Sequence, residues 1–161
     1  MHYSADISRT FPVNGTFTPE QKELYDLVVA SNEAAINAVA TGVTIQHLNN
    51  VARDVISRGL IKLGYMEKPE EVGKFLTHSI THALGLDTHD IHGRCYTTLK
   101  PGMVITIEPG IYIPDKKLGI RIEDDVAVTV HGCVNLSRDI PKKSEEVEAW
   151  IKSAKQSDSC A

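Results

Sequence analysis

Carboxylates recur where a β-strand would place them on one face. In residues 119–130, strand alternation puts Arg121, Glu123 and Asp125 on one side and apolar residues on the other. A solvent-facing strand with an arginine beside carboxylates is the simpler interpretation. Glu108 shifts the balance, because it ends a nearly apolar run where an ionised carboxylate is costly unless it is paired or binds a metal. Its own simpler interpretation is a strand-end carboxylate that faces water.

Histidines accompany these carboxylates. His78 and His82 are four residues apart and share a face in a strand or a helix, and His89 adds a third imidazole. The spacing alone is weak evidence, since structural histidines are common. Asp6 lies on a short N-terminal segment that we expect to be extended. Such a mixed set of carboxylate and imidazole ligands suits Mn, Fe, Co or Zn better than Mg or Ca. Carboxylates can bridge two such ions, and a hydroxide shared by the two ions is a nucleophile suited to peptide hydrolysis.

Two helices are predicted N-terminal to the strands that would carry His78, His82 and the two glutamates. Residues 18–21, Thr-Pro-Glu-Gln, form a capping-box start, and the helix that follows is expected to stop at Gly42. Thr44 is the expected N-cap of a second amphipathic helix that reaches Leu63. Both helices have an apolar stripe, which predicts that they pack on something large.

The second half of the chain reads as strands. Residues 75–86, 103–113 and 119–130 are β-rich runs separated by turn residues, and we predict that they form one sheet. A short C-terminal helix is expected over residues 144–154. Helices followed by strands predict an α+β fold in which two helices cover one face of a mainly antiparallel sheet.

Composition limits the class of protein. The 161 residues suit one domain, and a net charge of -4 without Lys or Arg clusters disfavours a nucleic-acid or membrane partner. Cys95, Cys133 and Cys160 lack CxxC spacing, which fits a reducing compartment. With no signal peptide or long apolar run, we expect a cytoplasmic location, although a full-length parent could be mitochondrial.

Four ordered motifs resemble the pita-bread metallopeptidases, and within them the Xaa-Pro aminopeptidases (aminopeptidase P). They occupy residues 3–12 (YSADISRTFP), 77–90 (THSITHALGLDTHD), 101–114 (PGMVITIEPGIYIP) and 119–129 (GIRIEDDVAVT). The last two are closer to aminopeptidase P, including its mitochondrial intermediate-cleaving relatives, than to prolidase, the nearest alternative. The resemblance implies one pita-bread domain over residues 1–161, incomplete at the N-terminus, with a curved, mainly antiparallel sheet.

The resemblance also implies a set of metal ligands. Asp6 and Glu123 match the family's two bridging carboxylates, and His82 matches its single histidine ligand. Glu108 matches the glutamate on the same ion as that histidine. Two ions are implied, manganese first, with zinc or cobalt as alternatives. The family's first aspartate lies about one hairpin upstream, before Met1, so we expect one ion here or a weakly held pair.

Further roles follow by motif position. Glu108 also matches the proton shuttle, and His78 and His89 match histidines that line the substrate pocket. Arg121 would be an outer cation that steadies the carboxylates. The implied activity is removal of the N-terminal residue before proline by a metal-bound hydroxide, on a peptide with proline at its second position. Homo-oligomerisation is left open.

A second class of function stays open. The chain could be a catalytically impaired or inactive pita-bread module that binds peptides or protein partners, because the upstream aspartate is missing. It could equally be part of a longer chain that supplies this residue. An inactive module has no chemical need for His82, Glu108 and Glu123 together. Their joint presence favours the enzyme.

Overall fold

The fold is α+β, as predicted. The computed structural model describes residues 2–90 and 97–158, so Cys95 and Cys160 lie outside the described residues. The helices are α1 (Pro19–Asn37), α2 (Ile45–Lys62) and α3 (Ser144–Asp158), with short 3-10 helices η1 (Pro69–Lys74) and η2 (Pro114–Lys116). The strands are β1 (Val104–Ile107), β2 (Gly110–Ile113), β3 (Leu118–Arg121), β4 (Asp124–Thr129) and β5 (Gly132–Asn135).

The first two helices begin at the predicted caps. The Thr18 side chain accepts a hydrogen bond from Gln21 N, and the Gln21 side chain accepts one from Thr18 N. The Thr44 side chain likewise accepts from His47 N. However, α1 ends at Asn37 and does not reach Gly42. The backbone leaves the helix there, and Gly42 N donates to Leu99 O (2.9 Å).

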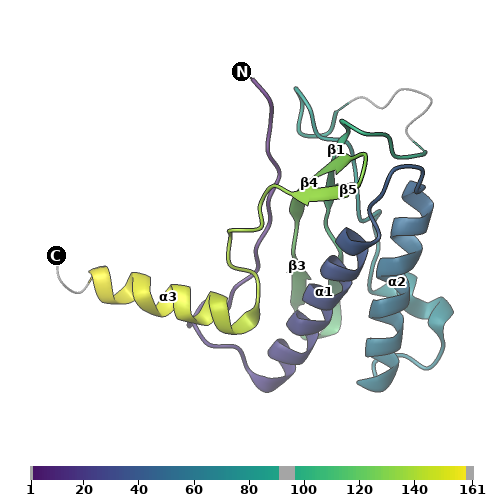
Figure 1. The fold of residues 1–161 in the computed structure, drawn as a ribbon. Coiled ribbons are helices and arrows are strands. Elements are labelled where there is room, and N and C mark those ends of the chain that lie inside the picture. Colours follow the sequence, from purple (N-terminus) through teal and green to yellow (C-terminus); the bar gives the residue numbers. More distant parts are fainter. Residues whose placement is uncertain (1, 91–96, 159–161) are drawn as a thin grey trace.

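Helices α1 and α2 lie side by side, and α1 packs across the strands (Figure 1). Apolar side chains of both helices meet the inward side chains of the strands in one core. Its fully buried members include Leu24, Val28, Leu48, Ile56, Ile105, Ile107, Ile111 and Val126. Burying an apolar side chain of this size contributes about 1.5–3 kcal/mol to the free energy of unfolding. This core fixes the strands whose opposite face carries the charged groups.

The strands form two antiparallel sheets, so the prediction of one sheet was wrong. One sheet has the order β1-β4-β5 and the other is the pair β2-β3. Both hairpin pairings keep the same register: Ile107 pairs with Asp124, and Gly110 pairs with Arg121. Glu108 therefore lies opposite Glu123 at the break. Pro109 has no N–H to offer the ladder, which explains the interruption there.

Residues 75–86 do not form the predicted strand. They run beside β1, and Glu108 N donates to Ile80 O (2.7 Å) while Thr106 N donates to His82 O (3.0 Å). Leu84 N donates to Val104 O (3.0 Å), but two other N–H groups bond to side chains: Ile80 N to Asn49 Oδ1 and His82 N to Thr106 Oγ1, both 3.1 Å. Only an isolated bridge, Ala83 to Ile105, results. Side chains thus replace two of the ladder bonds that a regular strand would form here.

The N-terminal residues form the expected extended segment. Glu123 N donates to Ser8 O (3.0 Å), and Ser4 N donates to Gly85 O (2.8 Å). The segment runs beside the sheet from the top of the molecule toward the start of α1 (Figure 1). Asp6 is therefore carried to the hairpin break between β3 and β4. Within residues 2–90 and 97–158, no helix is both long and apolar enough to cross a membrane.

Candidate metal centre

Three carboxylates converge on one imidazole nitrogen. His82 Nε2 lies 3.4 Å from Asp6 Oδ2, 3.5 Å from Glu108 Oε1 and 3.8 Å from Glu123 Oε1. The carboxylates come from the N-terminal segment, the end of β1 and the β3–β4 connection. Ligand atoms of His82, Glu108 and Glu123 all lie within 4.8 Å of one another. The four residues predicted as metal ligands are thus brought together.

The orientation of His82 fits a metal ligand. Its Nδ1 donates to the Ala83 carbonyl (3.0 Å), which leaves Nε2 with a free lone pair in the neutral imidazole. Nε2 is buried and has no hydrogen-bond partner among the described residues. A lone pair facing three carboxylates is repulsive unless a cation lies between them. The donor set of one nitrogen and several carboxylate oxygens suits a divalent transition-metal ion.

The carboxylates themselves are under electrostatic strain. Burial raises the pKa of Glu123 to about 7, the Ser8 hydroxyl opposes this, and the charges of Glu108 and Asp6 add to it. Burial also raises the pKa of Asp125, whose Oδ2 accepts a long bond from Asp6 N (3.3 Å). Asp125 Oδ1 is buried and lacks a partner in the described part of the chain. A divalent cation would relieve this concentration of negative charge.

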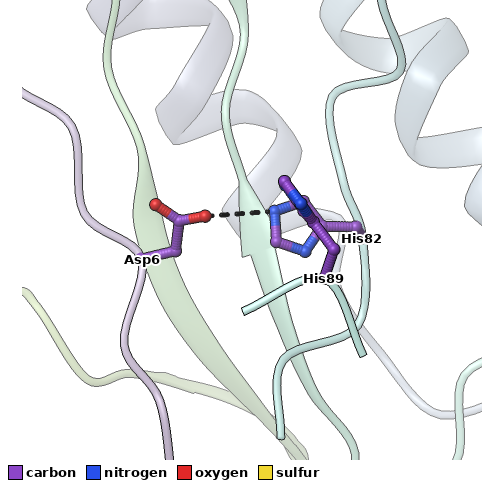
Figure 2. A group of neighbouring side chains, drawn as sticks. All are labelled: Asp6, His82 and His89. Atoms are coloured by element: carbon purple, nitrogen blue, oxygen red, sulfur yellow. Dashed lines mark ion pairs between the residues drawn. The ribbon is translucent and has the colours of Figure 1, made fainter. Parts of the chain in front are cut away.

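His89 lies next to the predicted ligands. Figure 2 shows its ring against that of His82, with Asp6 across from both. The two ring centroids are 4.5 Å apart and the rings meet edge to face at 73°. Ligand atoms of Asp6, His82 and His89 also fall within 4.8 Å of one another. His89 is exposed, so it stands at the open side of the centre.

His78 reaches the site only through other side chains. Its Nε2 lies 2.9 Å from Tyr112 Oη, and the same oxygen accepts from Arg121 Nε (2.8 Å). Arg121 Nε is in turn 3.8 Å from Glu108 Oε2. Two hydrogen bonds therefore lead from His78 through Tyr112 to Arg121, and a longer ion pair connects Arg121 to Glu108. Strand alternation predicted that Arg121 shares a face with Glu123, and the structure places its Nε in an ion pair with Glu108.

Both simpler interpretations of the acidic residues are wrong for this structure. Glu108 is 9% exposed and Glu123 is 2% exposed, so neither carboxylate faces water at a strand surface. Asp125 is buried as well, and Arg121 alone of the alternating set is exposed. The alternation is nevertheless interrupted, since Arg121 ends β3 and Asp125 lies in β4.

Two side chains of the site were missed in the sequence. Ser8 donates from Oγ to Glu123 Oε2 (2.6 Å), and its position two residues after Asp6 on an extended segment was an available signal. Tyr112 joins His78 to Arg121, with the Arg121 guanidinium also 5.8 Å from its ring centroid. No spacing in the sequence links Tyr112 to His78.

Comparison with known proteins gives a consistent result. The model of metallopeptidase family M24 matches residues 1–130. The Xaa-Pro aminopeptidase of Escherichia coli is 40% identical over 96% of this chain. The structure of Pseudomonas aeruginosa aminopeptidase PepP is 40% identical over 96% of the chain, with a TM-score of 0.90. Zinc-substituted Escherichia coli aminopeptidase P in complex with product is 40% identical over 95%, with a TM-score of 0.88.

These similarities confirm the pita-bread fold expected from the motifs. They cover only part of each relative: the chain spans 39% of the length of the Escherichia coli protein and 39% of the Pseudomonas aeruginosa chain.

Proposed function

Because this chain belongs to metallopeptidase family M24, we propose that it carries the metal centre of an aminopeptidase that removes the N-terminal residue before proline. One observation supports this above all: three carboxylates surround a buried His82 Nε2 that has no hydrogen-bond partner in the described residues. The relatives named as Xaa-Pro aminopeptidases support the substrate class. Three cysteines without CxxC spacing favour a reducing, cytoplasmic location.

In this proposal Asp6, His82, Glu108 and Glu123 hold the ion, with manganese as our first choice and zinc or cobalt as alternatives. A divalent ion in such a site supplies a nucleophile from water at neutral pH and polarises a carbonyl. The zinc-substituted Escherichia coli structure shows that a relative accepts zinc. The chain would hold one such ion or a weakly bound pair.

The chain's own residues would divide the remaining work. Glu108 presents Oε1 toward His82 and Oε2 toward Arg121, so it can move a proton on one oxygen while the Arg121 cation steadies the other. His89, at the open side, is placed to contact a bound peptide. His78 holds the Tyr112 hydroxyl, and through it the orientation of Arg121.

Metal content tests the proposal first. We expect the protein to bind about one manganese ion or more per chain after dialysis, and His82→Ala to bind at least about tenfold more weakly, because the one nitrogen ligand of the proposed set is removed. His131→Ala is the matched control, since His131 is exposed and outside the centre. Elemental analysis and isothermal titration give the stoichiometry and affinity.

Peptide cleavage then separates enzyme from binding module. The loaded protein should release the first residue of an Xaa-Pro peptide faster than that of a matched Xaa-Ala peptide, followed by chromatography. A protein that binds metal but cleaves neither peptide with manganese, zinc or cobalt would support the inactive module. A protein that binds none of these ions would sink the proposal.

A further inference from the structure

Arg9 lies behind the metal centre and contacts the backbone on which it is built. Its Nη1 donates to Glu123 O (2.7 Å) and to Ser8 O (3.0 Å). Ser8 O also accepts from Glu123 N (3.0 Å), so the two backbone segments are joined twice at this point. Arg9 therefore ties the segment that carries Asp6 to the residue that carries the Glu123 carboxylate.

The guanidinium has further partners on a third segment. Its Nε donates to Pro141 O (3.0 Å), and Nη2 donates to Ile140 O (3.3 Å) and to Asp124 Oδ1 (2.8 Å). The Arg9 side chain is 9% exposed. One planar group thus connects the N-terminal segment, the β3–β4 connection and the segment before α3.

Neutralisation of the Asp124 carboxylate does not by itself account for the contacts of Arg9. The Asp124 carboxylate is fully buried and has a second cation, Lys142 Nζ, at 2.9 Å from Oδ2. Burial would raise the pKa of Asp124, but the Ser137 hydroxyl and the Lys142 and Arg9 cations lower it below its ordinary value. Both cations form ion pairs with Asp124. Of the two, Arg9 is the one that donates to Glu123 O and Ser8 O.

We propose that Arg9 is a positioning residue for the metal centre. Its fork of N–H groups holds the Ser8 and Glu123 backbones in the register at which the Asp6 and Glu123 carboxylates converge on His82. The Ser8 hydroxyl, bonded to Glu123 Oε2 at 2.6 Å, is set by the same register. This inference rests on the proposed function, because it concerns the same metal centre.

The substitution Arg9→Lys is the sharpest test of this role. The ammonium keeps the positive charge for Asp124, but it lacks the planar fork that reaches several acceptors in fixed directions. Lys142→Met is the matched control, because it removes a cation from Asp124 and leaves the Arg9 contacts to Ser8 and Glu123 in place. Comparison of the two variants therefore separates the effect of losing an ion pair to Asp124 from the effect of losing the Arg9 contacts to the metal centre.

The experiment measures manganese affinity by isothermal titration, and thermal unfolding in chelator, for wild type and both variants. We expect Arg9→Lys to weaken manganese binding about 10- to 100-fold, as loss of an outer partner of metal ligands does. We expect Lys142→Met to keep the affinity within about twofold while lowering the melting temperature. Arg9→Gln, measured in the same way, replaces Arg9→Lys if circular dichroism shows that the lysine variant is unfolded.

Each outcome decides the inference. Wild-type affinity in Arg9→Lys overturns it and leaves the proposed function standing. Equal losses of affinity in Arg9→Lys and Lys142→Met also overturn it, since Arg9 would then act only through Asp124. A wild-type chain that binds no manganese, zinc or cobalt overturns the proposed function and this inference together.

Discussion

At the scale of the residue, Glu123 shows what the centre demands of its carboxylates. It is 2% exposed, lies opposite Glu108 across the hairpin break, and has His82 Nε2 at 3.8 Å. Burial raises its pKa to about 7 in the metal-free protein. A buried ionised carboxylate is stable only when a cation or hydrogen bonds compensate it, and Ser8 supplies one such bond.

This raised pKa predicts how stability depends on pH without metal. Because the folded pKa lies above the ordinary 4.5, protonated Glu123 contributes stability that is fully present below about pH 4.5 and is lost as the pH rises through about 7. Glu123→Gln stays neutral at every pH. In chelator, we expect this variant to melt at a higher temperature than wild type at pH 8 and at a similar temperature at pH 5, by circular dichroism.

Glu70→Gln is the control for the loss of an acidic side chain, since Glu70 is exposed. It should leave the difference from wild type the same at both pH values. If Glu123→Gln also shows no change between pH 5 and pH 8, Glu123 does not titrate in this range.

At the scale of the element, the hairpin built from β1–β4 and β2–β3 presents Glu108 and Glu123 to each other. The two pairings share one register, and the break between them falls at these carboxylates. Gly110 begins β2 directly beyond the break. A Cβ there would lie 2.9 Å from Ile120 O and 2.7 Å from Tyr112 Oη. The close approach of the strands therefore requires glycine at this position.

Gly110→Ala should destabilise the protein. The added methyl meets backbone as well as the Tyr112 hydroxyl, and overpacking of this kind costs about 1–3 kcal/mol of unfolding free energy, measured by urea titration. In Gly73→Ala the nearest atom to the new Cβ is Arg53 Nη1 at 3.9 Å, so this control should stay within about 0.5 kcal/mol of wild type. Equal stability of the two variants would contradict the tight packing of β2 on β3.

At the scale of the whole molecule, the centre joins parts of the chain that are distant in sequence. Asp6 comes from the N-terminal segment, His82 from the residues beside β1, and Glu123 from the β3–β4 connection. An ion held by all three would cross-link the fold. Because such a site does not exist in the unfolded chain, binding should appear as folding stability.

We expect manganese to raise the melting temperature reversibly. At a free concentration 100 times the dissociation constant, a ligand of the folded state adds about 2.7 kcal/mol. For a chain of 161 residues this corresponds to about 5–10 °C in differential scanning fluorimetry. Chelator should reverse the shift, and His131→Ala should retain it. A shift of the same size in His82→Ala would place the stabilising ion elsewhere.

Local rules in the sequence determined the helices, their caps and the chemistry of the site. The capping residues Thr18 and Thr44 act within one turn, so their roles follow from neighbours in the chain. The cost of a carboxylate after the apolar residues of β1 marked Glu108 before any contact was known. The motif resemblance then identified the family, the fold and the candidate ligands, and the structure brings those ligands together.

Tertiary structure alone decided how these parts meet. Residues 75–86 have the composition of a strand, but the side chains of Asn49 and Thr106 accept from Ile80 N and His82 N, which interrupts the ladder with β1. Tyr112 lies between His78 and Arg121 only because separate segments pack together. Arg9 contacts Glu123 O for the same reason. Periodicity reports which face a side chain takes on its own element, whereas a contact between elements depends on how the folded layers pack.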